Sequence, residues 1–213
     1  MFSGRAEYFD SLSPFNPMLA RNLIMNEPVV LLFILNLIFI GLLPQIFFRK
    51  DGRFNLLWWV TASPFVLCAL FLMLAAAGYI TPFRPDGWAR WLDLAAVPFS
   101  VASIALLFFT LGTHRIPIAL WHQDNDAPRQ IVTYGAYRRI RHPFYASFIL
   151  ALLGAFVFCP HWGTLYALLH GATVLNLTAA REERRLSASE FGDEYRRYIE
   201  QTGRFWPRFK AQV

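Results

Sequence analysis

The chain has 213 residues, which suits one domain, and its composition argues against a soluble fold. Hydrophobic residues make up 56% of it and charged residues only 16%, whereas a soluble domain carries about 25% charged residues. The net charge of +6 comes from bases beside long apolar runs, so the sequence favours membrane lipids, not nucleic acid, as its partner. Cys68 and Cys159 have no metal-site spacing, and no metal is predicted.

Residues 1–27 form a polar lead. Glu7, Asp10 and Glu27 lie in it, and no small-residue cleavage site follows a short apolar core, so it does not read as a cleavable signal. Pro14 and Pro17 interrupt any helix there.

Five apolar runs then follow, and about 20 apolar residues are needed to cross a bilayer as a helix. The predicted spans are 28–48, 56–80, 91–111, 144–160 and 162–180. Tryptophans at several span ends are typical of the membrane interface. The sequence therefore predicts an all-α, polytopic, multi-pass membrane protein with five transmembrane helices.

The basic residues predict its orientation. Sixteen fall on one side of the membrane: Arg49, Lys50, Arg53, Arg115, Arg129, Arg138, Arg139, Arg141, Arg181, Arg184, Arg185, Arg196, Arg197, Arg204, Arg208 and Lys210. Only four fall on the other: Arg5, Arg21, Arg84 and Arg90. By the positive-inside rule the N-terminus lies outside and the C-terminus in the cytoplasm, as five spans require. A bacterial inner membrane and the endoplasmic reticulum both remain open, as does the oligomeric state.

Polar residues inside the spans are expected to join helices. We expect Asn36 and Asn176 to form interhelical hydrogen bonds, and His170 to bond a neighbouring helix. Three prolines inside spans are expected to kink them: Pro44, Pro64 and Pro98.

The whole chain, 1–213, is predicted to be one domain in five parts. These are the lead 1–27, three spans over 28–111, a cytoplasmic loop 112–142, a helical hairpin 143–181 and a cytoplasmic tail 182–213. The loop is long for a compact domain, which is typical of functional segments.

The hairpin brings two distant motifs to the same depth. Its turn is short, and at about 1.5 Å per residue both legs are roughly 26–29 Å long. We therefore predict that the Arg141-His142-Pro143 motif and the Glu182-Glu183 pair are neighbours at the cytoplasmic face.

The two motifs have complementary chemistry. A helix that starts at Pro143 offers free N–H groups to an anion, and Arg138, Arg139 and Arg141 strengthen this preference. The glutamates can hold an ammonium group or ribose hydroxyls. Nearby tyrosines offer flat faces for a purine: Tyr134, Tyr137, Tyr145, Tyr195 and Tyr198. S-adenosylmethionine carries a carboxylate, an ammonium, a ribose and an adenine.

Simpler interpretations exist for each residue alone. Arginines beside a span are commonly topology anchors, and a Glu-Glu pair after a span is commonly solvated. A histidine before a proline, such as His142, is more often a helix cap than a catalyst.

Taken together, the motifs resemble a known family. Gly135-Ala136-Tyr137, then Arg141-His142-Pro143-Phe144-Tyr145, an apolar hairpin and Glu182-Glu183 resemble the signature of the isoprenylcysteine carboxyl methyltransferase and phospholipid methyltransferase superfamily. The tail is also similar, through Leu186, Phe191-Gly192, Tyr195, Tyr198 and Pro207. The likeness covers about residues 130–208, while the first three spans match only as generic apolar helices.

The resemblance implies an S-adenosylmethionine-dependent methyltransferase whose cofactor lies under the loop and is covered by the C-terminal segment. It implies two catalytic candidates, Arg141 and His142. It also implies a cofactor-binding set: Tyr134, Gly135, Tyr137, His142, Pro143, Tyr145, Glu182 and Glu183. The spacing from Leu186 to Gly192 is one residue longer than the family pattern, which slightly favours Glu183 over Glu182 as the main ligand.

The methyl acceptor is expected to be lipophilic. A prenylated cysteine carboxylate leads, and a phospholipid amine or a small thiol are alternatives. Arg141 or a loop arginine would orient an acceptor carboxylate, and an amine acceptor would need a base such as His142 or a glutamate. Related sterol reductases carry an Asn and a Gly-Asp pair where this chain has Phe144 and Ala146-Ser147, which argues against an NADPH-dependent reductase. A non-enzymatic membrane protein is the third reading.

Overall fold

The computed structural model describes residues 27–41, 47–49, 51–113 and 131–208 and is all-helical over them. This confirms the predicted fold class at that level. The helices are α3 (Glu27–Gly41), α4 (Leu56–Ala76), α5 (Ala89–Thr113), α6 (Pro143–Phe158), α7 (Trp162–Ser187) and α8 (Gly192–Gln201), with a 3-10 turn η1 (Gly135–Arg138) before α6.

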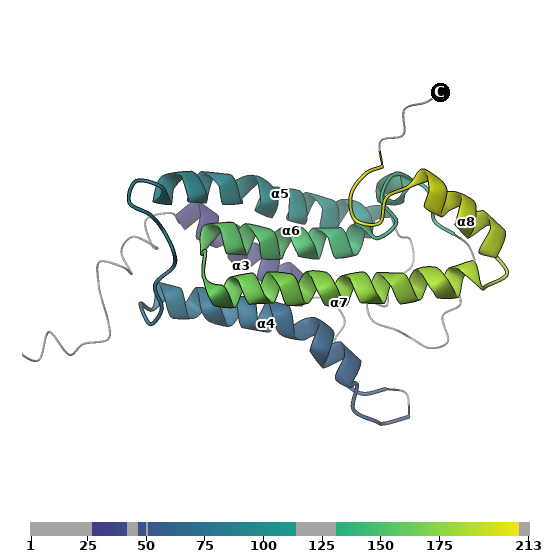
Figure 1. The fold of residues 1–213 in the computed structure, drawn as a ribbon, viewed down its shortest axis with the longest axis horizontal. Helices are drawn as coiled ribbons and strands as arrows, with labels where there is room; N and C mark the ends of the chain where they lie inside the picture. Colours follow the sequence, from purple (N-terminus) through teal and green to yellow (C-terminus); the bar gives the residue numbers. More distant parts are fainter. Residues whose placement is uncertain (1–26, 42–46, 50, 114–130, 209–213) are drawn as a thin grey trace, which may run out of the picture.

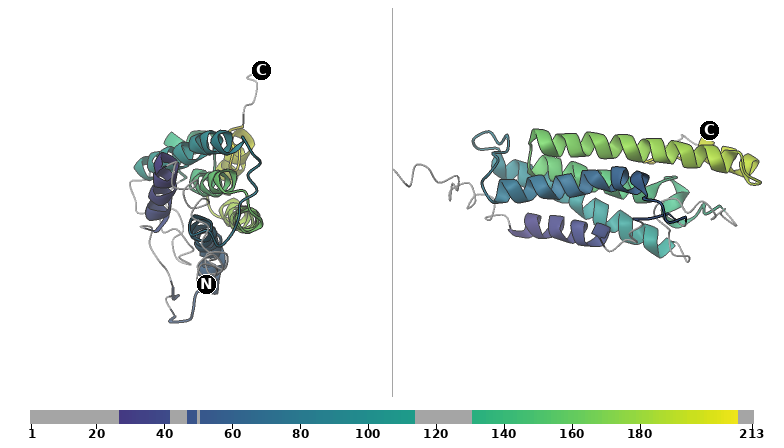
Figure 2. Two further views of the ribbon diagram at one scale, coloured as in Figure 1. Left: turned by 90° about the vertical axis from the view of Figure 1, so that its left-hand side faces the viewer. Right: turned by 90° about the horizontal axis from the view of Figure 1, so that it is seen from below.

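Helix α6 is the centre of the bundle. It packs against α5 on one side and α7 on the other, while α3 packs on α5 and α4 on α7 (Figures 1 and 2). Twelve of its 16 residues are buried. Its sequence is apolar on every face, and a helix of that kind is stable where other helices or lipid surround it.

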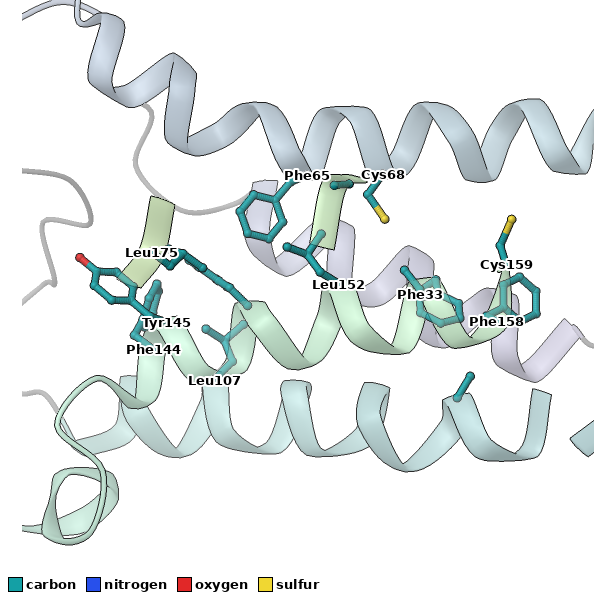
Figure 3. Close-up of a cluster of buried hydrophobic side chains, with 14 of the residues drawn as sticks. Phe33, Phe65, Cys68, Leu107, Phe144, Tyr145, Leu152, Phe158, Cys159 and Leu175 are labelled. Carbon is teal, nitrogen blue, oxygen red and sulfur yellow. The ribbon is translucent and has the colours of Figure 1, made fainter. Parts of the chain in front are cut away.

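The core is built on aromatic and branched side chains around α6 (Figure 3). The ring of Phe148 lies edge-on to Phe65 and to Phe144, with centroid separations of 5.2 and 4.8 Å. A small residue allows close approach on the α7 side, since a Cβ at Gly171 would lie 2.4 Å from Leu152 Cδ1. Small residues at helix contacts are typical of membrane bundles.

Hydrogen bonds join the helices through the residues predicted to do so. The hydroxyl of Ser103 on α5 lies 2.9 Å from Asn36 Oδ1 on α3 and 2.7 Å from the Ser147 carbonyl oxygen on α6. His170 Nε2 on α7 lies 3.2 Å from the Val60 carbonyl oxygen on α4. The predictions for Asn36 and His170 are therefore confirmed.

Asn176 has a different partner from the one predicted. Its Oδ1 accepts a hydrogen bond of 2.7 Å from Arg204 in the C-terminal segment, not from a neighbouring long helix. Asn176 lies at the part of α7 that the C-terminal segment crosses, so Arg204 can reach it.

The predicted spans and the observed helices differ at their ends. The first predicted span was wrong in extending to Phe48, because Phe48 lies outside α3 and forms a β-bridge with Phe54. Helix α4 ends at Ala76, before the predicted residue 80. Helix α7 continues to Ser187, so the boundary predicted at 181 falls inside a helix.

By length and composition, α4 and α5 can each cross a bilayer, and α6 is a shorter apolar helix. Pro64 and Pro98 lie inside α4 and α5. Several positions used in the sequence analysis lie outside the described residues. These are most of the lead with Arg5 and Arg21, Pro44, Lys50, Arg115, Arg129 and Lys210.

An ion pair holds the α4–α5 connection against the end of α6. Arg84 donates to the Asp93 carboxylate and, at 2.9 Å, to the Ala89 carbonyl oxygen. Its guanidinium carbon lies 5.6 Å from the centroid of the Phe158 ring. The side chains of Arg84 and Asp93 are only 12% and 4% exposed, so each charge depends on the other.

Replacing Asp93 by Ala should therefore lower the free energy of unfolding by about 3–5 kcal/mol, because it leaves a buried guanidinium unpaired. Denaturant unfolding of the purified protein in lipid discs measures the change. The matched control is Asp86→Ala, an exposed acid in the same connection, which should change stability little. Equal stability of the two variants would contradict the prediction.

Candidate functional site

The two predicted motifs meet in the structure. Arg141 Nε donates to Glu183 Oε1 over 2.9 Å, and His142 Nδ1 lies 3.4 Å from Glu182 Oε2. Helix α6 begins at Pro143, the first-turn position predicted for it, and α7 runs antiparallel past that point. The predicted juxtaposition is confirmed.

The turn at the far end of the hairpin fixes this register. His161 caps α7 by accepting a hydrogen bond of 3.0 Å from the Gly163 N–H, and the Thr164 hydroxyl meets the His161 backbone N–H at 3.2 Å. A Cβ at Gly163 would lie 2.4 Å from the Phe71 ring, so only glycine allows α4 this close to the turn.

Both carboxylate oxygens of Glu183 accept hydrogen bonds from arginine side chains. Besides Arg141, it accepts two bonds from Arg204, at 3.1 Å from Nε to Oε1 and 2.5 Å from Nη2 to Oε2. Its side chain is 9% exposed. Two guanidinium groups thus occupy both oxygens of one buried carboxylate, an arrangement that fixes geometry strongly.

The C-terminal segment is also joined to the loop before α6 by its backbone. The Arg141 N–H donates to the Gly203 carbonyl at 2.8 Å, and the Gly203 N–H donates to the Arg139 carbonyl at 3.1 Å. The His142 N–H donates to the Arg204 carbonyl at 3.0 Å. This short parallel bridge places Arg204 beside Glu183.

Arg141 is engaged on several sides. Its Nη1 donates to the Ile199 carbonyl at 3.1 Å and to the Thr202 carbonyl, at the end of α8. Together with the bond to Glu183, these contacts make Arg141 a link between the loop, α7 and α8.

Glu182 has a different environment from its neighbour. Its Oε1 accepts a hydrogen bond of 2.6 Å from the Tyr145 hydroxyl, and its side chain is 29% exposed. The rings of Tyr145 and His142 lie parallel at 5.4 Å. Burial, the nearby Tyr198 and the Glu182 carboxylate raise the pKa of Tyr137. The Tyr137 phenol therefore belongs to the cluster around Glu182.

His142 does not cap α6 with its side chain, contrary to the simpler interpretation. Its ring lies between the two glutamates, with Nε2 3.3 Å from Glu183 Oε1. That contact lacks hydrogen-bond geometry, and among the described residues the buried Nε2 has no hydrogen-bond partner. A buried polar atom of this kind calls for an explanation, such as a ligand.

The residues of η1 face the protein as well as the site. Gly135 has a positive φ of 60°, and a Cβ there would lie 2.4 Å from Thr113 Oγ1 at the end of α5. The Tyr137 carbonyl accepts a hydrogen bond of 2.5 Å from the Tyr198 hydroxyl. Tyr134 is 53% exposed, so its side chain lies largely on the surface. Gly135 thus has a structural role whatever else the turn binds.

Two of the tyrosines predicted to offer purine faces are buried in the packing of α8. Tyr195 and Tyr198 lie 5.8 Å apart by ring centroids. Burial raises the pKa of Tyr198 to about 12. These rings stabilise the position of α8 and do not present open faces.

An open pocket of about 480 Å³ lies where α7 meets the C-terminal segment. Its lining consists of Ala180, Glu183, Arg184, Ser187, Ala188, Ile199 and Arg204. Glu183 is thus shared between the pocket and the cluster around His142.

Sequence reasoning missed three residues of this site: Asn176 as a tail contact, Thr202 and Arg204. The signal for Arg204 is electrostatic, since a glutamate that is buried in a helical bundle requires cationic partners. One partner, Arg141, is in the motif, and the second lies in the tail beside the tyrosines already noted.

Comparisons with protein-family models, curated proteins and solved structures find no match for this chain. The likeness to the methyltransferase superfamily therefore rests on the residues themselves.

Glu183→Gln should destabilise the protein far more than Glu182→Gln. The first change removes the counter-charge of the buried Arg141 and of the partly exposed Arg204, which amounts to about 3–5 kcal/mol. The second weakens one partly exposed hydrogen bond by about 1 kcal/mol. Denaturant unfolding, with proteolysis after Arg204 as a report on the tail, separates them. Similar losses in both variants would contradict the assignment of Glu183 as the central residue.

The same network predicts acid sensitivity. Burial alone would raise the pKa of Glu183, but His142, Arg204 and Arg141 bring it well below its ordinary value of 4.5. Because the folded pKa is lowered, the stabilisation is complete above about pH 4.5 and is lost as the pH falls below it. Unfolding measured from about pH 6 to about pH 3 should show this loss. Glu183→Gln should have a flatter profile, and an unchanged profile would count against the mechanism.

Proposed function

We propose that this chain is an integral membrane methyltransferase that uses S-adenosylmethionine to methylate a lipophilic acceptor. The observation that carries the proposal is the buried cluster at the start of α6, where His142 lies between two carboxylates with Nε2 left without a hydrogen bond. The family resemblance supports it.

The residues present fit the chemical groups of the cofactor. Glu182 is a partly exposed carboxylate, which suits an ammonium or a ribose hydroxyl. The first N–H groups of α6, after Pro143, suit a carboxylate. His142 Nε2 is a buried polar atom that a ligand would satisfy. Tyr137 and Tyr145 border the same group.

Of the two glutamates, we assign ligand binding to Glu182. Both oxygens of Glu183 already accept from Arg141 or Arg204, while Glu182 has one neutral donor, Tyr145, and partial exposure. This reverses the slight preference that the tail spacing gave. Glu183 then acts by holding the segment that closes over the site.

When bound, S-adenosylmethionine supplies an electrophilic methyl group on a sulfonium sulfur. The protein's main contribution is alignment, which can supply about 7–11 kcal/mol. Arg141, engaged on several sides, is a positioning residue in this scheme, and it holds the C-terminal segment in place. For an amine acceptor, the Nε2 atom of His142 would accept the proton that the amine loses.

The acceptor would reach the site from the bilayer, and its polar group is open among a prenylated cysteine carboxylate, a phospholipid amine and a thiol. The proposal places five spans in the membrane with the C-terminus in the cytoplasm, supported by α4, α5 and the sixteen bases predicted on one side. The site would then face the cytoplasm, where a soluble cofactor is available.

The test is calorimetric titration of S-adenosylhomocysteine into the purified protein. The parent should bind, and Glu182→Gln should bind about 10–100-fold more weakly, because a charge-assisted hydrogen bond is lost. Glu190→Gln, an exposed acid just after α7, is the matched control and should bind as the parent does. No binding to the parent protein would overturn the proposal.

A second measurement identifies the acceptor. Membranes containing the protein are incubated with methyl-labelled cofactor, and the labelled product is assigned as a carboxyl ester, a methylated amine or a thioether. Binding of NADPH without S-adenosylhomocysteine would favour the reductase, and full biological activity of His142→Ala would favour a non-enzymatic protein.

A further inference from the structure

A small hairpin precedes α4, described over residues 47–49 and 51–55. Phe48 and Phe54 form an antiparallel bridge, and the Arg49 N–H donates to the Arg53 carbonyl at 2.8 Å. Figure 1 shows the start of α4, with this hairpin, projecting away from the other helices. Its surface is thus not covered by the described part of the bundle.

The hairpin carries an ordered set of aromatic rings. Trp59, on the first turn of α4, stacks on Phe47 at 5.2 Å and on Phe54 at 5.8 Å between ring centroids. Phe48 meets Phe54 edge-on at 6.2 Å and is 63% exposed. Large rings that are packed together yet exposed mark an interaction surface.

Basic side chains flank these rings. Arg49 and Arg53 are both exposed, and Arg53 contacts the exposed Asp51 at 3.6 Å. Exposed ion pairs contribute little, so the arginines are free to bind other anions. The hairpin therefore combines an apolar ring layer with cations at its tip.

We propose that this aromatic–basic hairpin binds the anionic phospholipid headgroups of the membrane surface. Aromatic rings favour the headgroup level, and each base near an anionic surface adds attraction. Guanidinium groups also match phosphate geometry. This inference requires the chain to lie in a bilayer but does not depend on methyl transfer.

A second copy of the chain fits the surface less well. Two hairpins meeting face to face would bring Arg49 and Arg53 close to their equivalents, and like charges repel. Anionic lipid supplies the opposite sign together with an apolar layer for the rings.

The test uses the full-length protein with Asp51→Cys, labelled with a fluorescent donor. Cys68 and Cys159 are buried and are protected from labelling. The protein is placed in phosphatidylcholine discs with or without phosphatidylglycerol, and energy transfer to a trace of dye-labelled phosphatidylglycerol reports enrichment at the hairpin. Leu56→Cys, which leaves Asp51 in place, repeats the measurement from the adjacent exposed position.

We expect enrichment that falls with added salt and drops about fivefold for each of Arg49→Gln and Arg53→Gln. The control pair is Arg185→Gln with Arg197→Gln, two exposed arginines of α7 and α8, which should leave the signal unchanged. Enrichment that is absent, or that is equal in the hairpin variants and the control, overturns the proposal. Energy transfer that depends on the number of chains per disc also overturns the proposal, because it would show that the hairpin binds a second copy of the chain.

Discussion

The buried carboxylate of Glu183 is the interaction on which this end of the molecule depends. It connects three segments that are far apart in the sequence: the loop that ends at Arg141, helix α7, and the C-terminal segment at Arg204. A buried charge is stable only when it is paired. Detaching any one of these segments would therefore leave a charge of the others without its partner. The parallel bridge between Gly203 and Ile140 then fixes how the C-terminal segment is aligned with the loop.

Adjacent residues on a helix point about 100° apart, and this separates the two glutamates by function. Glu183 points toward the crossing C-terminal segment, where two guanidinium groups surround it. Glu182 points toward Tyr145 and retains contact with solvent. A Glu-Glu pair on one helix can therefore supply one residue that holds the structure and one that meets a ligand, and neither role follows from the sequence spacing alone.

Much of this arrangement was predictable because helix geometry is rigid. The equal legs of the hairpin placed His142 level with Glu182 without any contact being known. What could not be predicted depends on chain segments that are not helical. Apolar Phe48 reads as the end of a span, yet it turns back to pair with Phe54. In the sequence Arg204 looks like one more surface base, yet a short parallel backbone bridge places it beside Glu183.

Helix α6 is short, and its length bears on how deep in the bilayer the site would lie. Its 16 residues span about 24 Å, less than the roughly 30 Å of a bilayer's hydrocarbon core. Protein groups close both ends: Arg84 lies over Phe158 at one, and the Glu183 network lies at the other. In the proposed orientation, the start of α6 would lie near the cytoplasmic boundary of the hydrocarbon core, close to the polar group of a lipid-anchored acceptor. The same charged residues that fold the C-terminal segment onto the bundle would hold a water-soluble cofactor at the depth where a lipophilic substrate presents its reactive atom.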